Sequence, residues 1–596
     1  MPSNVSEGGD GGEDKKKKSD EAKLRGRSGN NWLILFATVA IALGSFLLTN
    51  KRGNTLPKTY AICSKDSDKV YVVDDRNLQT QCVVVDSVLI ADTGSLGSIR
   101  EKWGDIQIRY LPEGAVVLPG LSDSHGHVLE YGAAQQLPLE GAKSPQDVVA
   151  RVREYILATP EILEDKSQVI FGGGWDHTAW SSTGWPTAAD LDADSVVRGR
   201  PVILQSKDCH ALWVSSKAIK DSLPLPETIE GGVIVRDESG DPTGLFLDNA
   251  QDLLKQPELT EAELLRRFNV AVRDAHRYGL TSVHDAGLDP MSLAFFKRQA
   301  KKGTLPIRIY GMSYFDPHAP YWGNVTRPLI ATGNGRLTTR SVKIFADGAL
   351  RTGGSALHEV YHDNPKTRGF MRLEPEILFD VIPKFVKDGW QVNVHAIGDR
   401  ANGIVLDAFE ASLVGADVGA LRPRLEHAQM MTKEDMTRLG KLGVIASVQP
   451  THAISDMWYA EDRLGPERVK SLYAFRSIVD SGARITLGSD FPVETMDPLS
   501  GFYAAVTRKS PDGKSPHGPG GWFPEQKLTR REALRGMTID PAYASFTESI
   551  LGSLEIGKRA DFTVLSQDIM TVPEDQILST RVIATVIDGK PVFGDI

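Results

Sequence analysis

The sequence predicts an α/β fold: a parallel (β/α)8 barrel of the TIM type, with a small β-sandwich built from both chain ends and one N-terminal transmembrane helix. Three observations predict this fold. Apolar strand-like segments alternate with helix-like segments through the middle of the chain, which is typical of a parallel sheet with helical crossovers. Strand-like segments with turn signals recur near both chain ends. An uncharged apolar run occupies residues 32–48.

The apolar run at residues 32–48 is near the lower length limit for a membrane-spanning helix. Its basic flank predicts a single-pass membrane protein, with a disordered tail of residues 1–31 in the cytosol and the rest of the chain lumenal or extracellular, in the endomembrane system. A cleaved signal peptide is an alternative, but the polar tail is long and no clear cleavage site follows. The basic residues before the run are Lys15, Lys16, Lys17, Lys18, Lys23, Arg25 and Arg27.

The two ends of the chain, residues 58–118 and 552–596, are expected to form one composite β-sandwich, because both contain short strand-like segments. Cys63 and Cys82 lie in the first of these regions. A disulfide between them is permitted in an oxidising compartment, and two buried free thiols are the alternative. Cys209 has no cysteine near it in the sequence.

The barrel is expected to occupy residues 119–551, with a long insertion at about 130–278. Helix-like stretches include residues 261–278 and 375–387. In a parallel barrel, side chains at the C-terminal strand ends converge on a single mouth. The strand candidates are residues 115–118, 281–284, 307–310, 341–345, 391–395, 424–427, 444–448 and 484–490.

Metal-binding side chains recur at the ends of these strand candidates. His125 and His127 follow residues 115–118 and are two positions apart, so both imidazoles can face one ion. Imidazole suits zinc, iron, copper or nickel. A pair of surface histidines is the alternative for His125 and His127, and a helix N-cap is the alternative for Asp490. The later candidates are Lys343, His395, His427 and Asp490.

Lys343 separates a structural interpretation from a catalytic one, because an ammonium ion is costly to bury in an apolar strand. In the structural interpretation, the lysine pairs with an acid such as Asp347. In the catalytic interpretation, a neutral, desolvated amine captures carbon dioxide as a carbamate. The two carbamate oxygens would then bridge two metal ions.

Eleven short segments, in order, carry a resemblance to a known family: PGLSDSHGHV, GGGWD, DCHALWVSSKA, GGVIVRDESGDPTGLF, GLTSVHDAG, SVKIFADGAL, HAIGDRA, RLEHAQ, ASVQPTHA, LGSDFPVE and GSLEIGKRADFTVL. From about residue 58 onward the chain resembles the amidohydrolase superfamily, in its amidohydrolase-3 (YtcJ-like) branch, which includes N-substituted formamide deformylase. The resemblance implies a divalent metal cofactor, with zinc expected and two ions bridged by a carboxylated Lys343. It also implies that Asp490 is the catalytic proton shuttle. The implied metal shell is His125, His127, Lys343, His395, His427 and Asp490.

The implied reaction is hydrolysis of a carbon–nitrogen bond in a non-peptide amide or formamide-like small molecule, by a metal-activated hydroxide. Trp175, Asp176 and His210 in the insertion are candidate substrate contacts. Core packing is the alternative for Trp175, and a structural hydrogen bond is the alternative for His210. A second function class is a repurposed binding or signalling protein on the same fold. Loss of ligands would favour that class, and all of the implied ligands are present.

Charge and composition restrict the partners. The formal net charge of −9 implies no basic face and argues against a nucleic-acid partner. The expected partners are a small amide-like substrate and, through residues 32–48, a membrane. The sequence leaves a homodimer open.

Overall fold

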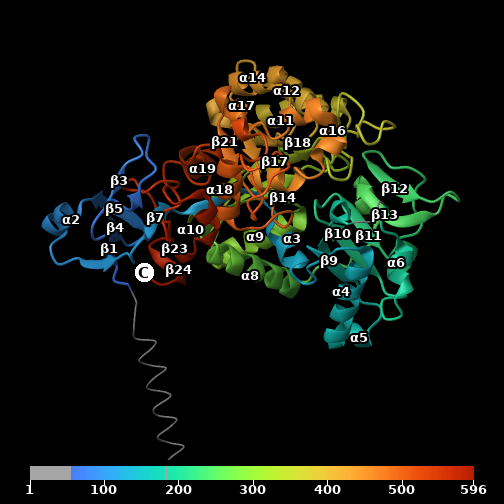
Figure 1. The fold of residues 1–596 in the computed structure, drawn as a ribbon, viewed down its shortest axis with the longest axis horizontal. Helices are drawn as coiled ribbons and strands as arrows, with labels where there is room; N and C mark the ends of the chain where they lie inside the picture. The colour runs from blue at the N-terminus through green and yellow to red at the C-terminus, as the bar shows by residue number, and fades with distance from the viewer. Residues whose placement is uncertain (1–55, 181–183) are drawn as a thin grey trace, which may run out of the picture. The chain divides into compact units, whose positions relative to one another are not determined.

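Eight parallel strands form a nearly closed barrel in the computed structural model, which describes residues 56–180 and 184–596 (Figure 1). The barrel closes where a parallel bridge joins Gly126, at the end of the first strand, to Phe491, which follows the last strand. A short strand, β16 (Leu329–Ala331), pairs with β17 outside this path. In barrel order the strands are β8 (Leu121–Gly126), β14 (Leu280–Leu288), β15 (Arg308–Tyr314), β17 (Leu337–Phe345), β18 (Gln391–Ala396), β19 (Arg424–His427), β20 (Ile445–Val448) and β21 (Ile485–Leu487).

The first barrel strand differs from the one expected from the sequence. The apolar run at residues 115–118 forms β7 (Val116–Pro119), which belongs to an outer sheet. The strand breaks at Gly120, where a Cβ atom would lie 2.2 Å from Oγ1 of Thr281. The chain then enters the barrel as β8, which carries His125. The sequence interpretation was therefore wrong by one strand.

Helices connect the barrel strands, as the alternating pattern predicted. Helix α9 shows how the sequence sets their ends: Asp289 caps its N-terminus, and Gly303 ends it with a left-handed φ of 69°. The connecting helices include α8 (Glu261–Arg277), α9 (Pro290–Lys302), α11 (Pro375–Lys387), α12 (Asp399–Ser412), α14 (Lys433–Leu442) and α17 (Phe475–Asp480). Other helices of this part of the chain are α3 (Val128–Ala134), α15 (Pro450–Asp456), α16 (Ala460–Arg468), α18 (Pro498–Thr507), α19 (Arg530–Gly536) and α20 (Ile539–Ala544).

The long segment between β8 and β14 forms a sheet of its own with strand order β12-β13-β11-β10-β9. A tryptophan-rich apolar cluster that includes Trp175, Trp180 and Trp213 packs against this sheet. The strands are β9 (Ile170–Trp175), β10 (Val202–Ser206), β11 (Ala211–Val214), β12 (Gly232–Arg236) and β13 (Pro242–Asp248), with helices α4 (Pro145–Ala158), α5 (Pro160–Glu164), α6 (Ala188–Ala193) and α7 (Ser216–Asp221).

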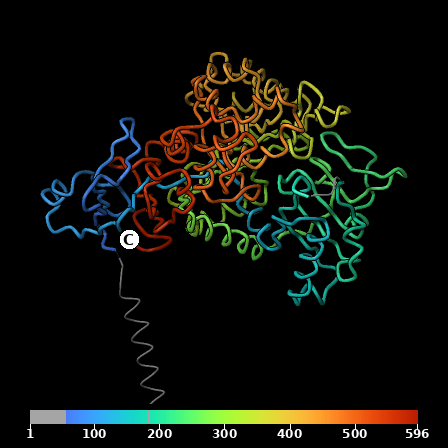
Figure 2. The backbone as a smooth tube through the Cα atoms, in the orientation of Figure 1, coloured from blue at the N-terminus to red at the C-terminus, as the bar shows by residue number. Residues whose placement is uncertain are grey.

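Two further sheets lie outside the barrel. One is six-stranded and combines β7, β2 (Val70–Tyr71) and β3 (Gln79–Thr80) with β22 (Phe562–Leu565), β23 (Val582–Ile587) and β24 (Lys590–Gly594). Figure 2 shows the blue N-terminal and red C-terminal segments of this region side by side. The other sheet is four-stranded and contains β1 (Thr59–Cys63), β4 (Cys82–Asp86), β5 (Leu89–Gly94) and β6 (Gln107–Tyr110), beside α2 (Leu96–Trp103).

A disulfide joins Cys63 of β1 to Cys82 of β4, which are direct cross-strand neighbours. Of the two alternatives that the sequence left open for this pair, the structure has the disulfide. Cys209 is a free thiol.

The predicted membrane topology requires a correction. Among the helices of residues 56–180 and 184–596, none combines the length and the apolar character needed to cross a bilayer. The expected span at residues 32–48 lies outside the described residues. The fold is thus corrected to a mixed α/β barrel with no membrane-spanning helix in its described part. The predicted location, that of a single-pass membrane protein with a lumenal or extracellular catalytic part, depended on that helix. This prediction is therefore corrected as well.

Candidate metal centre and substrate cavity

The C-terminal strand ends bring the sequence-predicted ligands to one place, because parallel strands of a barrel end at a common mouth. In the register of β17, β18 and β19, Phe345 pairs with His395, and Ala396 pairs with His427. The ring centres of His125 and His427 are 4.6 Å apart, and those of His395 and His427 are 4.4 Å apart. The set in this region is His125, His127, Lys343, His395, His427 and Asp490.

Asp490 is the anion at the centre of this set. Its Oδ1 lies 3.2 Å from Nε2 of His127 and 3.5 Å from Nε2 of His125. Burial alone would raise the pKa of Asp490, but His125 and His127 outweigh burial and lower this pKa below its ordinary value. Asp497, and not Asp490, caps the following helix α18. The N-cap alternative for Asp490 is therefore not what the structure shows.

The buried imidazoles are suited to bind a cation. Burial lowers the pKa of His125, His395 and His427 well below the ordinary value, so each ring is neutral and has a free lone pair. Within the described chain, both ring nitrogens of His395 are buried without a hydrogen-bond partner. Such an orphaned group is costly unless something binds it. The donor set therefore fits a metal ion.

Each of two candidate ligands is oriented by a hydrogen bond on its far side. Nδ1 of His125 donates to Oε2 of Glu426 at 2.5 Å, and neither side chain is exposed. Glu426 is itself paired with Arg424, whose Nε lies 2.7 Å from Oε1. His427 is similarly held, with Nδ1 2.9 Å from Oε1 of Gln449. Partners of this kind fix the tautomer of a metal-binding histidine and leave its Nε2 free.

Lys343 is fully buried beside the histidines, with Nζ 3.4 Å from Nε2 of His125. Burial lowers the pKa of Lys343 to about 8. The alternative partner, Asp347, forms no ion pair with it in the described chain. The Asp347 carboxylate instead accepts backbone N–H groups of Ile397 and Gly398, at 3.0 and 2.9 Å. The structure therefore does not show the lysine–acid pair of the structural interpretation.

His452 joins the site although the sequence interpretation did not include it. Its Nε2 lies 3.8 Å from Oδ2 of Asp490 and has no hydrogen-bond partner among the described residues. Two groups of side chains are close enough to hold an ion: His125, His127 and Asp490, and His427, His452 and Asp490. His452 lies in α15, directly after β20, so the rule of ligands at strand ends could have found it.

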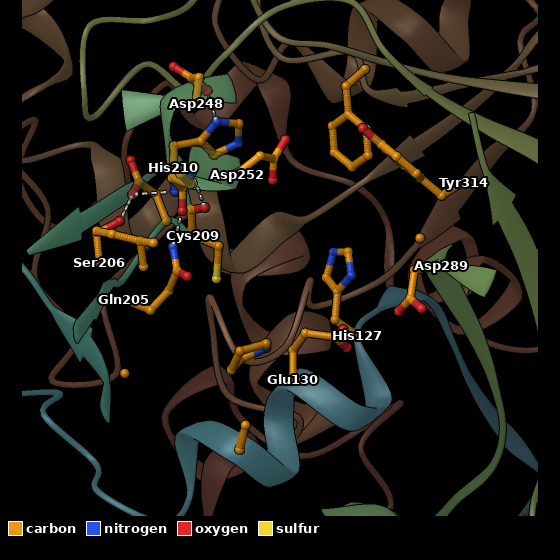
Figure 3. Close-up of a pocket in the computed structure, with 18 of the residues that line it drawn as sticks. His127, Glu130, Gln205, Ser206, Cys209, His210, Asp248, Asp252, Asp289 and Tyr314 are labelled. Atoms are coloured by element: carbon orange, nitrogen blue, oxygen red, sulfur yellow. Dashed lines mark hydrogen bonds and ion pairs between the residues drawn. The ribbon is translucent and has the colours of Figure 1, made fainter. Parts of the chain in front are cut away.

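A cavity of about 1330 Å³ opens onto the candidate metal centre. Figure 3 shows His127 and Glu130 at one side of this cavity, and Cys209, His210 and Asp252 of the insertion across from them. The lining includes both barrel and insertion residues. The insertion thus forms one wall of the space above the metal centre.

The three predicted substrate contacts have different surroundings. His210 lines the cavity, and its Nδ1 donates to Oδ1 of Asp248 at 2.5 Å. Trp175 is fully buried in the insertion core, where its indole N–H donates to the carbonyl of Leu204. Asp176 pairs with Arg351 and is not part of the cavity lining. The structure therefore brings His210, but not Trp175 or Asp176, to the cavity.

The barrel, the neutral imidazoles at its mouth and the cavity above them define the class, a metal-dependent hydrolase. A model of the amidohydrolase family matches residues 113–593 of the chain. The chain therefore belongs to the amidohydrolase family, which confirms the family predicted from its sequence motifs.

Relatives extend over most of the chain. The putative amidohydrolase YtcJ of Bacillus subtilis (strain 168) is 31% identical, and the match covers 88% of this chain and 98% of the relative. Protein LONG AFTER FAR-RED 3 of Arabidopsis thaliana is 32% identical, with 85% and 87% covered. N-substituted formamide deformylase of Arthrobacter pascens is 29% identical, with 87% and 96% covered.

A solved structure supports the same class. An uncharacterized metal-dependent hydrolase from Pyrococcus horikoshii OT3 superposes with a TM-score of 0.68 at 27% identity. The match covers 87% of this chain and 99% of the other chain. The relatives and the described residues give no support to the expected membrane contact or to a homodimer.

Proposed function

We propose that the chain hydrolyses a carbon–nitrogen bond of a small non-peptide amide or formamide-like substrate. The observation that carries the proposal is His395 beside the cavity, whose two buried ring nitrogens have no hydrogen-bond partner among the described residues, with Nε2 3.6 Å from Oδ1 of Asp347. A retained donor set of this kind is not needed by a binding or signalling protein, so hydrolysis is the better supported class. N-substituted formamide deformylase among the relatives favours an amide-like substrate.

The residues proposed to hold divalent metal, with zinc as the expected ion, are histidines, one carboxylate and one lysine. When bound, a divalent ion supplies Lewis-acid chemistry, since it polarises a carbonyl oxygen and lowers the pKa of water. Lys343 is buried and has no acid partner in the described chain, which supports its carboxylation and a site for two ions. The proposed ligands are His125, His127, Lys343, His395, His427 and Asp490.

The protein's own contribution to the reaction is to position the substrate and to move a proton. The Asp490 carboxylate takes a proton from the attacking water, whose oxygen bonds to the substrate carbonyl carbon. When the carbon–nitrogen bond breaks, the same carboxyl delivers that proton to the leaving nitrogen. His210, fixed by Asp248, is proposed to contact the substrate from the insertion wall.

Metal analysis and a substrate panel on the purified full chain test the proposal. We expect one to two equivalents of divalent metal per chain, and hydrolysis of at least some N-formyl or N-acyl compounds. Dialysis against a chelator should abolish the hydrolysis, and zinc should restore it. A chain that binds no metal, or that hydrolyses these compounds equally well after complete metal removal, would refute the proposal.

A further inference from the structure

Arg372 lines the cavity with a guanidinium group that forms no ion pair with any described residue. Its Nε donates to Oδ1 of Asn249 at 2.9 Å, and its guanidinium carbon lies 4.9 Å from the centre of the Phe345 ring. In the described part of the chain, its two terminal nitrogens donate to no group, and it forms no ion pair. These terminal nitrogens are the edge of the guanidinium that binds a carboxylate through two parallel hydrogen bonds.

The position of this guanidinium is fixed at several points. The backbone N–H of Arg372 donates to the carbonyl of Ala346 at 2.8 Å, directly after β17. Asn249 holds the residue at two places, because its Nδ2 also donates to the carbonyl of Arg372 at 3.2 Å. A side chain held in this way loses little conformational freedom when it binds a ligand. Arg372 is therefore preorganised.

Phe345 links Arg372 to the candidate metal centre. The Phe345 ring is 5.3 Å from the His395 ring, and Nζ of Lys343 lies 4.4 Å from its centre. The guanidinium of Arg372 and the amine of Lys343, one of the proposed ligands, thus both lie within 5 Å of the centre of the same ring. A group bound by Arg372 would belong to the same substrate molecule as the bond that is hydrolysed.

A purely electrostatic role is the main alternative for Arg372. Asp252 and Asp316 also line the cavity, and Arg372 could serve to offset their charge. However, neither carboxylate forms an ion pair with Arg372 in the structure, whereas other arginines close to acids do so, such as Arg308 with Asp561. Charge compensation alone does not explain why the terminal nitrogens of Arg372 donate to no group of the described residues.

We propose that Arg372 binds a carboxylate group of the substrate, so that the preferred amides carry an anionic carboxylate close to the bond that is cleaved. This preference rests on the proposed function, because it presupposes that the chain hydrolyses amides. The anion site itself is a binding property, and it can be measured without turnover.

A matched pair of compounds tests the anion site. N-formylphenylalanine and N-formylphenethylamine differ in the carboxylate and share the formamide and the aromatic group. For the purified metal-loaded chain, we expect a higher kcat/KM and tighter calorimetric binding for the acid. Arg372→Met should reduce the acid-to-neutral ratio by about 100-fold, the range of a charge-assisted bidentate pair, and Arg372→Lys by about 10-fold. Arg340→Met is the control, because it removes a guanidinium stacked on Phe546, outside the cavity lining.

The outcomes separate the two proposals. Tighter binding of the acid that depends on Arg372, without hydrolysis of either compound, would support the anion site and count against the proposed reaction. Hydrolysis of both compounds with a ratio that Arg372→Met leaves unchanged would support the reaction and overturn the anion site. Equal calorimetric affinity of the wild-type chain for the two compounds would overturn the anion site, whether or not either compound is hydrolysed.

Discussion

Replacing Glu426 with glutamine should weaken metal binding without removing a proposed ligand. The carboxylate of Glu426 accepts from Nδ1 of His125 at 2.5 Å and is fully buried. Glutamine keeps the size of the side chain and a carbonyl oxygen that can accept this bond. It removes the negative charge that makes the imidazole a stronger donor of electrons and holds its tautomer.

The expected size of the effect follows from these contacts. Loss of an orienting partner of a metal-binding histidine costs about 10–100-fold in affinity, which is about 1.4–2.7 kcal/mol. The change also leaves the buried Arg424 without the Glu426 carboxylate, whose Oε1 lies 2.7 Å from Nε of Arg424 in the wild type. Breaking a buried ion pair on one side costs about 3–5 kcal/mol of folding stability. Arg424 retains hydrogen bonds to Ser447 and Ser124, so the lower end of that range is expected.

The assay is a competition titration of zinc between the chain and a chromophoric chelator, together with urea unfolding of the metal-free protein. Glu410→Gln serves as the control, because Glu410 is an exposed glutamate that pairs with Arg438, and neither residue lines the cavity. Measuring metal affinity and stability separately distinguishes a site that binds poorly from a protein that has unfolded. A zinc affinity for Glu426→Gln within about twofold of the wild type would refute the orienting role.

Further outcomes follow from the same structure. Lys343→Ala should lower both metal content and rate, and added short carboxylic acids should restore part of the rate. Lys343→Arg should be inactive, because guanidinium stays protonated and cannot form a carbamate. Full metal content with normal turnover in Lys343→Ala would exclude a carbamate bridge. Asp490→Asn should keep much of its metal but lose about 100-fold or more in kcat, since the proton shuttle is gone; a normal kcat would remove Asp490 from that role. Reduction of Cys63–Cys82, which are 19 residues apart, should destabilise the four-stranded sheet by about 3 kcal/mol in urea unfolding, and coincident unfolding curves with and without reductant would contradict this.

The sequence predicted the barrel, and the gathering of the candidate ligands at its mouth, because both follow from one local signal, a buried strand that carries a metal-binding type of side chain. Each of His395, His427 and Lys343 lies in a buried stretch of strand, and parallel strands bring their C-terminal ends together whatever their separation in the sequence. His452 was missed because it lies one helix turn beyond a strand end. The interpretation of residues 115–118 failed because the strand signal does not say to which sheet a strand belongs.

The insertion was much harder to interpret. A glycine-rich strand that ends in Trp175 and is followed by Asp176 is compatible with either a substrate wall or a packed core, and the choice depends on partners such as Arg351 that are distant in the sequence. Arg372 and Asn249 carried no signal for the same reason, since their contact joins a loop after β17 to the end of β13. Roles of this kind require the three-dimensional neighbours to be known.

The outer six-stranded sheet has a consequence for how the protein is made. Strand β7 pairs with β22, which begins at Phe562. Its partner β22 is therefore synthesised after the whole barrel. Until then β7 has an open edge of unpaired backbone groups, a condition that favours association with other chains. A ribosome-bound chain should therefore need protection at this edge, and a nascent chain halted before Phe562 should aggregate through β7. Completion of this sheet is expected to be a late step in the folding of the protein.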